Sequence, residues 1–276
     1  MSYDDEYKKV SELVSKRMFK EAAEIIRENL SKGFGEFAGK GRHVSIANYL
    51  VLAADWSAIT SLLPKGTNFF LESGWLNSLF SGRPVNKNGD PIPWLTYPAI
   101  DFLDGRVQKN WRVFEWGSGN STIWWSNRVA SVHAVEDDSY WYEKCKNSYR
   151  ENVTLKFAGS PEEYVNSIEL NSEHLFDVVV IDGSHRNMCA EKALKHASSD
   201  GIIVFDNSDV PENEDGVRII TDSGWKRIDF FGLIPSYSYK NCTSVFFKND
   251  EILTKSNLPS RVNFSAGLTC SLAMKR

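Results

Sequence analysis

Short apolar runs, separated by stretches with helical periodicity, fill the second half of the chain. The runs are rich in valine, isoleucine and aromatic residues and predict strands at 112–116, 131–136, 153–157, 176–182 and 201–206. Between them the apolar positions predict helices over 121–129, 138–150, 160–171 and 187–198. Strands that alternate with helices imply parallel βαβ units with right-handed crossovers. The pattern therefore predicts a doubly wound α/β fold.

The centre of the sheet and its edge carry different signals. Unbroken valine and isoleucine runs at 178–181 and 202–205 suit strands that are buried on both faces, as central strands are. Two later runs, 225–231 and 242–247, predict strands that pair antiparallel at an edge. We therefore expect one α/β domain over residues 99–250.

The first 66 residues follow a helical pattern instead. Apolar positions recur at helical spacing through 4–32 and again through 43–63. Residues 1–66 are therefore expected to form an N-terminal helical extension, either a cap on the domain or a dimerisation element that makes a homo-oligomer. Residues 251–276 are a C-terminal extension whose structure the pattern does not indicate.

Residues 67–98 link these two parts and are rich in proline, glycine and aromatic residues. Five of the nine prolines lie in 64–98, so regular structure here is expected to be short. Aromatic side chains in an irregular segment fit two interpretations equally well. The segment is either a lid, with Trp94 and Tyr97 covering a ligand, or a connecting segment packed onto the next domain.

Composition and charge narrow the function classes. The 276 residues include 32 Lys and Arg against 36 Asp and Glu, a formal net charge of −4, so no general attraction to nucleic acid is expected. No apolar run approaches the ~20 residues that span a bilayer, and the N-terminus lacks the apolar core of a signal peptide. The four cysteines are far apart and form no zinc-like pairs. The sequence predicts a cytoplasmic protein with no membrane span and no nucleic-acid partner.

The candidate chemistry lies at the carboxyl ends of the predicted strands, where open α/β sheets bind ligands. After the first strand, Gly117 and Gly119 allow a tight turn and close approach to a ligand, and a helix begins directly afterwards. Thr122 stands where a dinucleotide fingerprint needs a third glycine, and no GKS or GKT occurs, so neither fingerprint is present. Glu115, two places before the first glycine, can accept a hydrogen bond from an amine.

A second acid follows the next strand. Glu136 ends the strand at 131–136, 19 residues after Gly117. A carboxylate in that position can accept from both hydroxyls of a ribose. A solvated acid at a strand end is the alternative for Glu136 taken alone, and the neighbouring glycine turn favours the ribose interpretation.

The turn, ValPheGluTrpGlySerGlyAsnSerThr, resembles the acid-x-Gly-x-Gly motif of class I S-adenosylmethionine-dependent methyltransferases. The resemblance covers about residues 91–247, including the approach segment 91–103 and AspAsnSerAsp at 206–209, and the pattern is also similar to a bacterial subgroup associated with glycan biosynthesis. It implies a Rossmann-like, seven-stranded, mostly parallel sheet whose last strand is antiparallel. It also implies S-adenosylmethionine as the cofactor.

The resemblance assigns roles to particular residues. Glu115 would contact the methionine amino group through the loop, the two glycines would lie against the cofactor, and Glu136 would hold the ribose. The full set of implied cofactor contacts is Glu115, Gly117, Ser118, Gly119, Asn120, Ser121, Glu136, Asp137 and Tyr97. Tyr140 and Trp141, just beyond Glu136, are candidates for lining the adenine site, with core packing as an equal alternative.

The ends of the fourth and fifth strands leave three interpretations open. Asp182, Asp206 and Asn207 suit Mg²⁺, and they resemble the ligands of metal-dependent O-methyltransferases of the catechol and macrolide-sugar type. There the metal binds adjacent hydroxyls and lowers the pKa of the one that attacks. Alternatively Asp182 and His185 are catalytic without metal, with His185 as the general base. In the third interpretation the two aspartates only cap the following helices.

The sequence thus predicts methyl transfer from S-adenosylmethionine to a hydroxyl of a sugar, glycan or other small polyhydroxylated acceptor. Two alternatives remain. One is a nicotinamide-dependent, sugar-modifying enzyme on the same fold, which Thr122 opposes. The other is a non-catalytic protein that keeps the cofactor site and binds a partner through its N-terminal helices. Arg186 is a further candidate, as a contact for an acidic substrate.

Overall fold

The computed structural model describes residues 69–171, 175–237 and 239–254, together with six single residues near the N-terminus: Lys9, Glu12, Leu13, Met18, Glu21 and Glu24. The predicted helical extension over 1–66 lies outside the described residues apart from those six, and so does its proposed role in a homo-oligomer. Of the C-terminal extension only the short helix α13 (Glu251–Thr254) is described.

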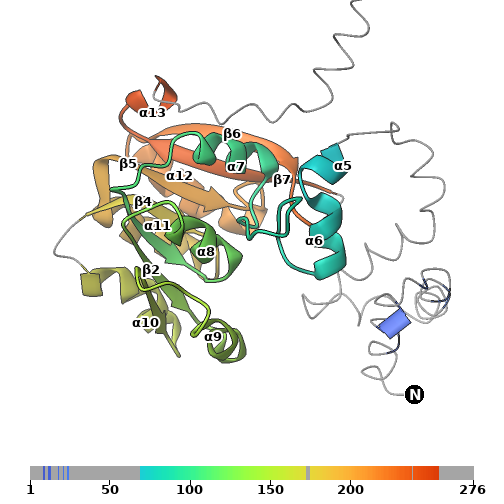
Figure 1. The fold of residues 1–276 in the computed structure, drawn as a ribbon. Coiled ribbons are helices and arrows are strands. Elements are labelled where there is room, and N and C mark those ends of the chain that lie inside the picture. Colours follow the sequence, from blue (N-terminus) through green and yellow to red (C-terminus); the bar gives the residue numbers. More distant parts are fainter. Residues whose placement is uncertain are drawn as a thin grey trace, which may run out of the picture.

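A seven-stranded sheet forms the centre of the molecule (Figure 1), in the order β3-β2-β1-β4-β5-β7-β6. The strands are β1 (Arg112–Trp116), β2 (Ser131–Glu136), β3 (Val153–Phe157), β4 (Phe176–Ile181), β5 (Ala197–Asp206), β6 (Lys226–Leu233) and β7 (Lys240–Phe247). The first five are parallel, and β7 is antiparallel to both β5 and β6. This is the Rossmann-like topology typical of methyltransferase folds, so the predicted fold class is confirmed.

The valine and isoleucine run of β4 shows why this sheet is buried on both faces. Alternate residues of a strand point to opposite faces. Val178 and Val180 pack into one core cluster, whereas Val179 and Ile181 pack into the other. All four side chains are at most 1% exposed, as expected for a central strand between two helical layers.

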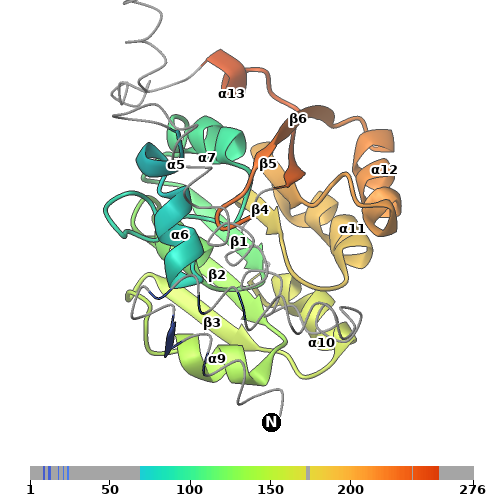
Figure 2. The ribbon, with the colours of Figure 1, turned by 90° about the vertical axis from the view of Figure 1, so that its right-hand side faces the viewer.

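Helices cover both faces (Figure 2). The helices of one layer are α6 (Trp75–Ser81), α7 (Tyr97–Asp104) and α8 (Asn120–Ser126). Those of the other layer are α10 (Pro161–Asn166), α11 (Arg186–His196) and α12 (Glu214–Asp222). The remaining elements are α5 (Phe69–Glu72), α9 (Ser139–Cys145) and the 3-10 turns η2 (Ser167–Asn171) and η3 (Pro211–Asn213). No helix in the described part of the chain is long and apolar enough to cross a membrane.

The predictions for β1 to β4 agree with the structure within one residue, and those for β6 and β7 differ by two residues at one end, but β5 is longer than predicted. It begins at Ala197, where the pattern predicted the end of a helix. The polar residues 198–200 suggest a turn, yet Ala197 pairs with Phe176 across a register shift between Phe176 and Val178. Helix α12 was not predicted, and α9 ends at Cys145, short of the predicted 150.

The described part of the aromatic segment packs onto the α/β domain. Trp75 and Leu95 are each 1% exposed and belong to the core cluster that also contains Val113 of β1. The indole of Trp75 donates to the carbonyl of Tyr237, 2.8 Å away, in the loop between β6 and β7. These residues therefore contribute directly to the core on one face of the sheet.

Candidate functional site

The glycine turn after β1 is confined on two sides. The amide of Gly117 donates to the carbonyl of Val135 in β2 at 2.9 Å. A methyl group added at Gly117 would lie 3.1 Å from the carbonyl oxygen of Asp182, which follows β4. Gly117 also has a φ of 97°, which disfavours other residues. The sheet therefore brings the ends of β1, β2 and β4 together at a position that suits glycine.

Glu115 is buried directly before this turn, with 1% exposure. The hydroxyl of Thr122 donates to its Oε2 at 2.6 Å and accepts from the amide of Gly119 at 3.0 Å. Its Oε1 is buried without a hydrogen-bond partner in the described structure. Burial raises the pKa of Glu115 to about 8. In the sequence, Thr122 is informative only because it replaces the third glycine of a dinucleotide fingerprint. The structure shows that its hydroxyl links Glu115 to the turn.

Glu136, at the end of β2, is held beside the same turn. Ser118 donates to its Oε2 at 2.7 Å, and the amides of Asp137 and Asp138 donate to its Oε1, both at 3.1 Å. Burial is the main reason why the pKa of Glu136 is raised. The structure thus brings together Ser118 and Glu136, two of the residues assigned to the cofactor.

Trp141 of α9 lies against the other side of the turn. Its indole donates to the carbonyl of Ser118 at 2.8 Å. A methyl group added at Gly119 would lie 3.6 Å from the indole ring. The neighbouring Tyr140, in contrast, is 59% exposed. Trp141 therefore forms a flat wall beside the glycines, in a place that suits an adenine ring.

The remaining residues predicted to contact the cofactor are Asn120, Ser121, Asp137 and Tyr97. Asn120 donates through its side-chain amide to the carbonyl of Pro84 at 2.7 Å, which joins the turn to the aromatic segment. Ser121 and Asp137 are half-buried next to Glu115 and Glu136. Tyr97 is buried in the core with its ring 5.2 Å from that of Phe69. A cofactor contact by Tyr97 stays a prediction.

Arg186 connects the ends of β4 and β5. Its Nη2 donates to Oδ1 of Asp182 at 3.3 Å, and its Nη1 lies 3.9 Å from Oδ2 of Asp206 and donates to the Asp206 carbonyl. Its Nε donates to the carbonyl of Gly183 at 2.9 Å. Asp206 also accepts from the Thr243 hydroxyl at 2.6 Å. Burial and the neighbouring Asp182 raise the pKa of Asp206, and Arg186 opposes them.

These contacts do not fit the predicted magnesium site. The carboxyls of Asp182 and Asp206 face a guanidinium, whose positive charge would repel a metal ion bound between them. Asn207 has a φ of 54°, and its carbonyl accepts from Asn213 at 2.9 Å. Within the described residues, no group of three or more His, Cys, Asp or Glu side chains is arranged to hold a metal. The side chains at the ends of β4 and β5 therefore do not fit Mg²⁺.

The capping interpretation is wrong for both aspartates. His185 stands at the N-cap of α11 and Val210 at that of η3, and neither makes a side-chain cap hydrogen bond. Asp182 and Asp206 instead face Arg186, as described above. Their contacts are made across the strand ends and leave the first turns of the following helices uncapped.

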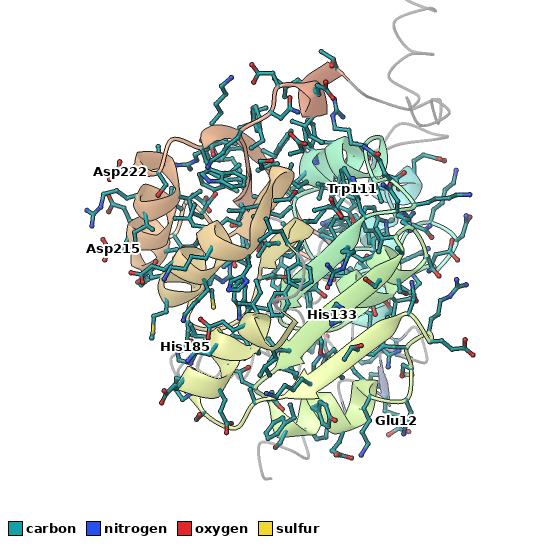
Figure 3. All side chains as sticks on the ribbon, turned by 90° about the vertical axis from the view of Figure 1, so that its left-hand side faces the viewer. Glu12, Trp111, His133, His185, Asp215 and Asp222 are labelled. Carbon is teal, nitrogen blue, oxygen red and sulfur yellow. The ribbon has the colours of Figure 1, made fainter. Side chains whose placement is uncertain are left out.

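His185 is exposed at the end of the loop after β4, with a left-handed φ of 55°. Figure 3 shows it at the start of α11, apart from His133, which lies within β2. The ring of Tyr164 lies 6.0 Å from that of His185. The hydroxyl of Tyr164 is buried without a hydrogen-bond partner in the described structure, and a methyl group on Gly183 would overlap it. No motif in the sequence points to Tyr164.

An aromatic group lies beside Asp206. The rings of Trp94 and Tyr237 are 5.7 Å apart, and those of Tyr237 and Tyr239 are 5.1 Å apart. Trp94 donates to the carbonyl of Pro235 at 2.8 Å, which fixes the loop between β6 and β7. The loop that holds Tyr237 and Tyr239 leads into β7, whose Thr243 pairs with Asp206, so the group lies near the end of β5. The pKa of Tyr239 is raised by burial and then by the charge of Asp206.

Four acids therefore gather at the strand ends: Glu115, Glu136, Asp182 and Asp206. Each has a raised pKa, with burial as the largest cause, and the charges of Glu136 and Asp182 add to the rise at Glu115. Arg186 is the cation that pairs with two of them. A site with this excess of acids favours a cationic ligand and disfavours a phosphate.

No family model and no curated protein matches this sequence. Solved structures with a similar arrangement include a precorrin-6Y C5,15-methyltransferase from Geobacter metallireducens, 19% identical over 55% of this chain and 87% of that chain, with a TM-score of 0.44. An rRNA methylase from Streptococcus thermophilus is 13% identical over 54% and 93%, with a TM-score of 0.41. Spermidine synthase from Thermotoga maritima is 15% identical over 59% and 61%, with a TM-score of 0.44. These likenesses are too distant to bear on activity.

Proposed function

We propose that this protein is an S-adenosylmethionine-dependent methyltransferase. The observation that carries the proposal is a glycine turn held between two buried carboxyls at the ends of adjacent strands. Glu115 offers an oxygen without a partner on one side, and Ser118 fixes Glu136 on the other. A ligand that joins an amine to a ribose matches these two acceptors.

The residues at the turn fit that cofactor. Glu136 would accept from the ribose hydroxyls, Glu115 would attract the ammonium group, and Trp141 would pack against the adenine. The cofactor, when bound, supplies a methyl group activated by a positive sulfonium. The neighbouring acids match this positive charge, since four carboxyls gather at the strand ends and one guanidinium pairs with only two of them.

The same features oppose a nicotinamide cofactor. A pyrophosphate at this turn would meet the carboxyls of Glu115 and Glu136, and its negative charge would repel their ionised forms and raise their pKa values further. The amide of Gly119, which could bind a phosphate, already donates to Thr122 at 3.0 Å. The nicotinamide-dependent alternative is therefore disfavoured by charge as well as by sequence.

We further propose that the acceptor is a hydroxyl of a sugar or another small polyhydroxylated compound. Trp94, Tyr237 and Tyr239 offer flat apolar faces beside Asp206, and a sugar ring combines an apolar face with hydroxyl groups at its rim. Carboxylates accept hydrogen bonds from such hydroxyls. The protein must align the hydroxyl with the methyl group and remove its proton, and His185 or Asp182 is placed at the strand end for that second task.

The test is isothermal titration of S-adenosylhomocysteine into the full-length protein and a Glu136→Ala variant. The wild type should bind saturably, and the variant about tenfold or more weakly because it loses charge-assisted hydrogen bonds. Glu151→Ala is the matched control, since Glu151 is exposed in the loop before β3, and it should bind like the wild type. Absence of binding by folded wild-type protein would overturn the proposal.

A further inference from the structure

The side chain of Arg186 connects two strand ends through three hydrogen bonds, one from each of its nitrogens. Nε bonds to the loop after β4, Nη2 to Asp182, and Nη1 to the carbonyl of Asp206 while lying 3.9 Å from that residue's carboxylate. The arginine side chain is 14% exposed and the Asp206 side chain 4% exposed. Each nitrogen of the guanidinium therefore has a partner within the protein. This disfavours the predicted contact between Arg186 and an acidic substrate.

A divalent cation between the carboxyls of Asp182 and Asp206 would neutralise their charge, as the guanidinium of Arg186 does. Two carboxyls at the ends of adjacent parallel strands repel each other when both are ionised, and a cation between them removes that repulsion. Mg²⁺ would need carboxylate lone pairs and room for several water ligands in near-octahedral geometry. Here the guanidinium occupies the space between the carboxyls, and Thr243 donates to the other oxygen of Asp206 at 2.6 Å.

We propose that Arg186 takes the place of a divalent metal ion at the ends of β4 and β5, so that the site works without one. Arg186 is then a positioning residue, which holds Asp182 and Asp206 at fixed places and favours their ionised forms against the effect of burial. Its planar fork suits two separate oxygen partners, and it keeps its proton at any working pH. The exclusion of metal rests on these contacts alone, whereas a role in methyl transfer rests on the proposed function.

Mn²⁺ binding to the full-length protein, followed by the electron paramagnetic resonance signal of free Mn²⁺, tests the proposal. Arg186→Gln and Arg186→Lys form the matched pair, because both are shorter polar side chains and only lysine keeps the charge. The wild type and the lysine variant should bind no stoichiometric Mn²⁺. The glutamine variant should gain one site, tighter than any wild-type binding by about tenfold or more, and an added Asp206→Asn should remove it.

Two results would overturn the proposal. One is stoichiometric Mn²⁺ binding by the wild type that Asp206→Asn abolishes. The other is a folded Arg186→Gln variant, shown by cooperative thermal unfolding, that gains no site. If that variant does not fold, Mn²⁺ binding by the wild type, compared with that of Asp206→Asn, still tests the proposal. Titration of S-adenosylhomocysteine into the same wild-type protein tests the proposed function separately, so the two failures are distinguishable.

Discussion

Glu115 combines burial, a hydrogen bond from Thr122 and an unpartnered oxygen in one side chain. Thr122 donates to one carboxyl oxygen, while the other is buried without a partner among the described residues. A buried carboxyl with so few donors favours its neutral form, because desolvation penalises the charge. An amine ligand would supply the missing partner and favour the ionised form. Ionisation of Glu115 at high pH therefore lowers the stability of the protein without ligand, and a bound cation would favour that ionised form.

Stability should consequently depend on pH through Glu115. Its folded pKa of about 8 lies above the ordinary value of 4.5, so between these values the folded state holds a proton that the unfolded state has lost. The contribution is fully present below the ordinary pKa and is lost as pH rises through the folded pKa. Glu115→Gln should therefore flatten the fall in Tm between about pH 5 and about pH 8. Thermal unfolding at a series of pH values measures this.

Glu151→Gln is the control for that series, because Glu151 is exposed. It should keep the wild-type dependence of Tm on pH. If Glu115→Gln and the wild type show the same slope, Glu115 is ionised in the folded protein and the account of its burial is wrong.

At the scale of elements, the turn between β1 and α8 depends on its contact with the loop after β4. Gly117→Ala combines an unfavourable φ of 97° with a methyl group 3.1 Å from the Asp182 carbonyl. We expect a loss of about 1–3 kcal/mol in the free energy of unfolding, together with weaker binding of S-adenosylhomocysteine. Urea denaturation and calorimetric titration measure the two effects.

Gly224→Ala separates backbone strain from crowding. Gly224 has a comparable φ of 79°, but a methyl group there would meet nothing within 4 Å. It lies between α12 and β6, away from the glycine turn. Its substitution should cost stability by strain alone and leave binding unchanged. Equal losses of binding in the two variants would contradict a specific role for the turn.

The insertion of β7 between β5 and β6 also positions the site. Thr243 on β7 donates to Asp206 on β5 and accepts from the amide of Thr96 at 3.1 Å. Thr96 in turn donates to the carbonyl of Phe230 on β6 at 2.9 Å. A short chain of hydrogen bonds thus joins the start of α7 to the acid at the end of β5, which places the aromatic segment beside the candidate acceptor site.

At the scale of the whole molecule, residues 69–98 behave as part of the core. Trp75 is 1% exposed among residues from α7, α8 and the sheet. Trp75→Ala should therefore cost about 3–5 kcal/mol in the free energy of unfolding, measured by urea denaturation. Leu170→Ala is the control, because Leu170 is 65% exposed, and it should change stability by less than about 0.5 kcal/mol. Near-wild-type stability of Trp75→Ala would favour the lid interpretation of this segment.

Local sequence determined much of this protein. Runs of valine and isoleucine require burial on both faces, so the strands of the central sheet could be located from periodicity alone. The glycine turn and Glu136 could be placed together, because parallel strands bring their carboxyl ends to one edge. Helix α12 and the start of β5 escaped prediction, since Ala197 is held in the strand by pairing with Phe176, a contact distant in sequence.

The contacts between side chains at the strand ends depend on the three-dimensional fold and could not be predicted from the sequence. Asp182 and Asp206 alone suggested a metal site, because the sequence shows which acids end the strands but not where the Arg186 side chain points. Arg186 begins α11, directly after the loop that follows β4, and its guanidinium lies within 4 Å of both carboxyls. The side chains of Thr122 and Tyr164 likewise point into the site, where they contact Glu115 and Gly183. Periodicity fixes which residues meet at a sheet edge, whereas the pairing of charges there depends on packing in three dimensions.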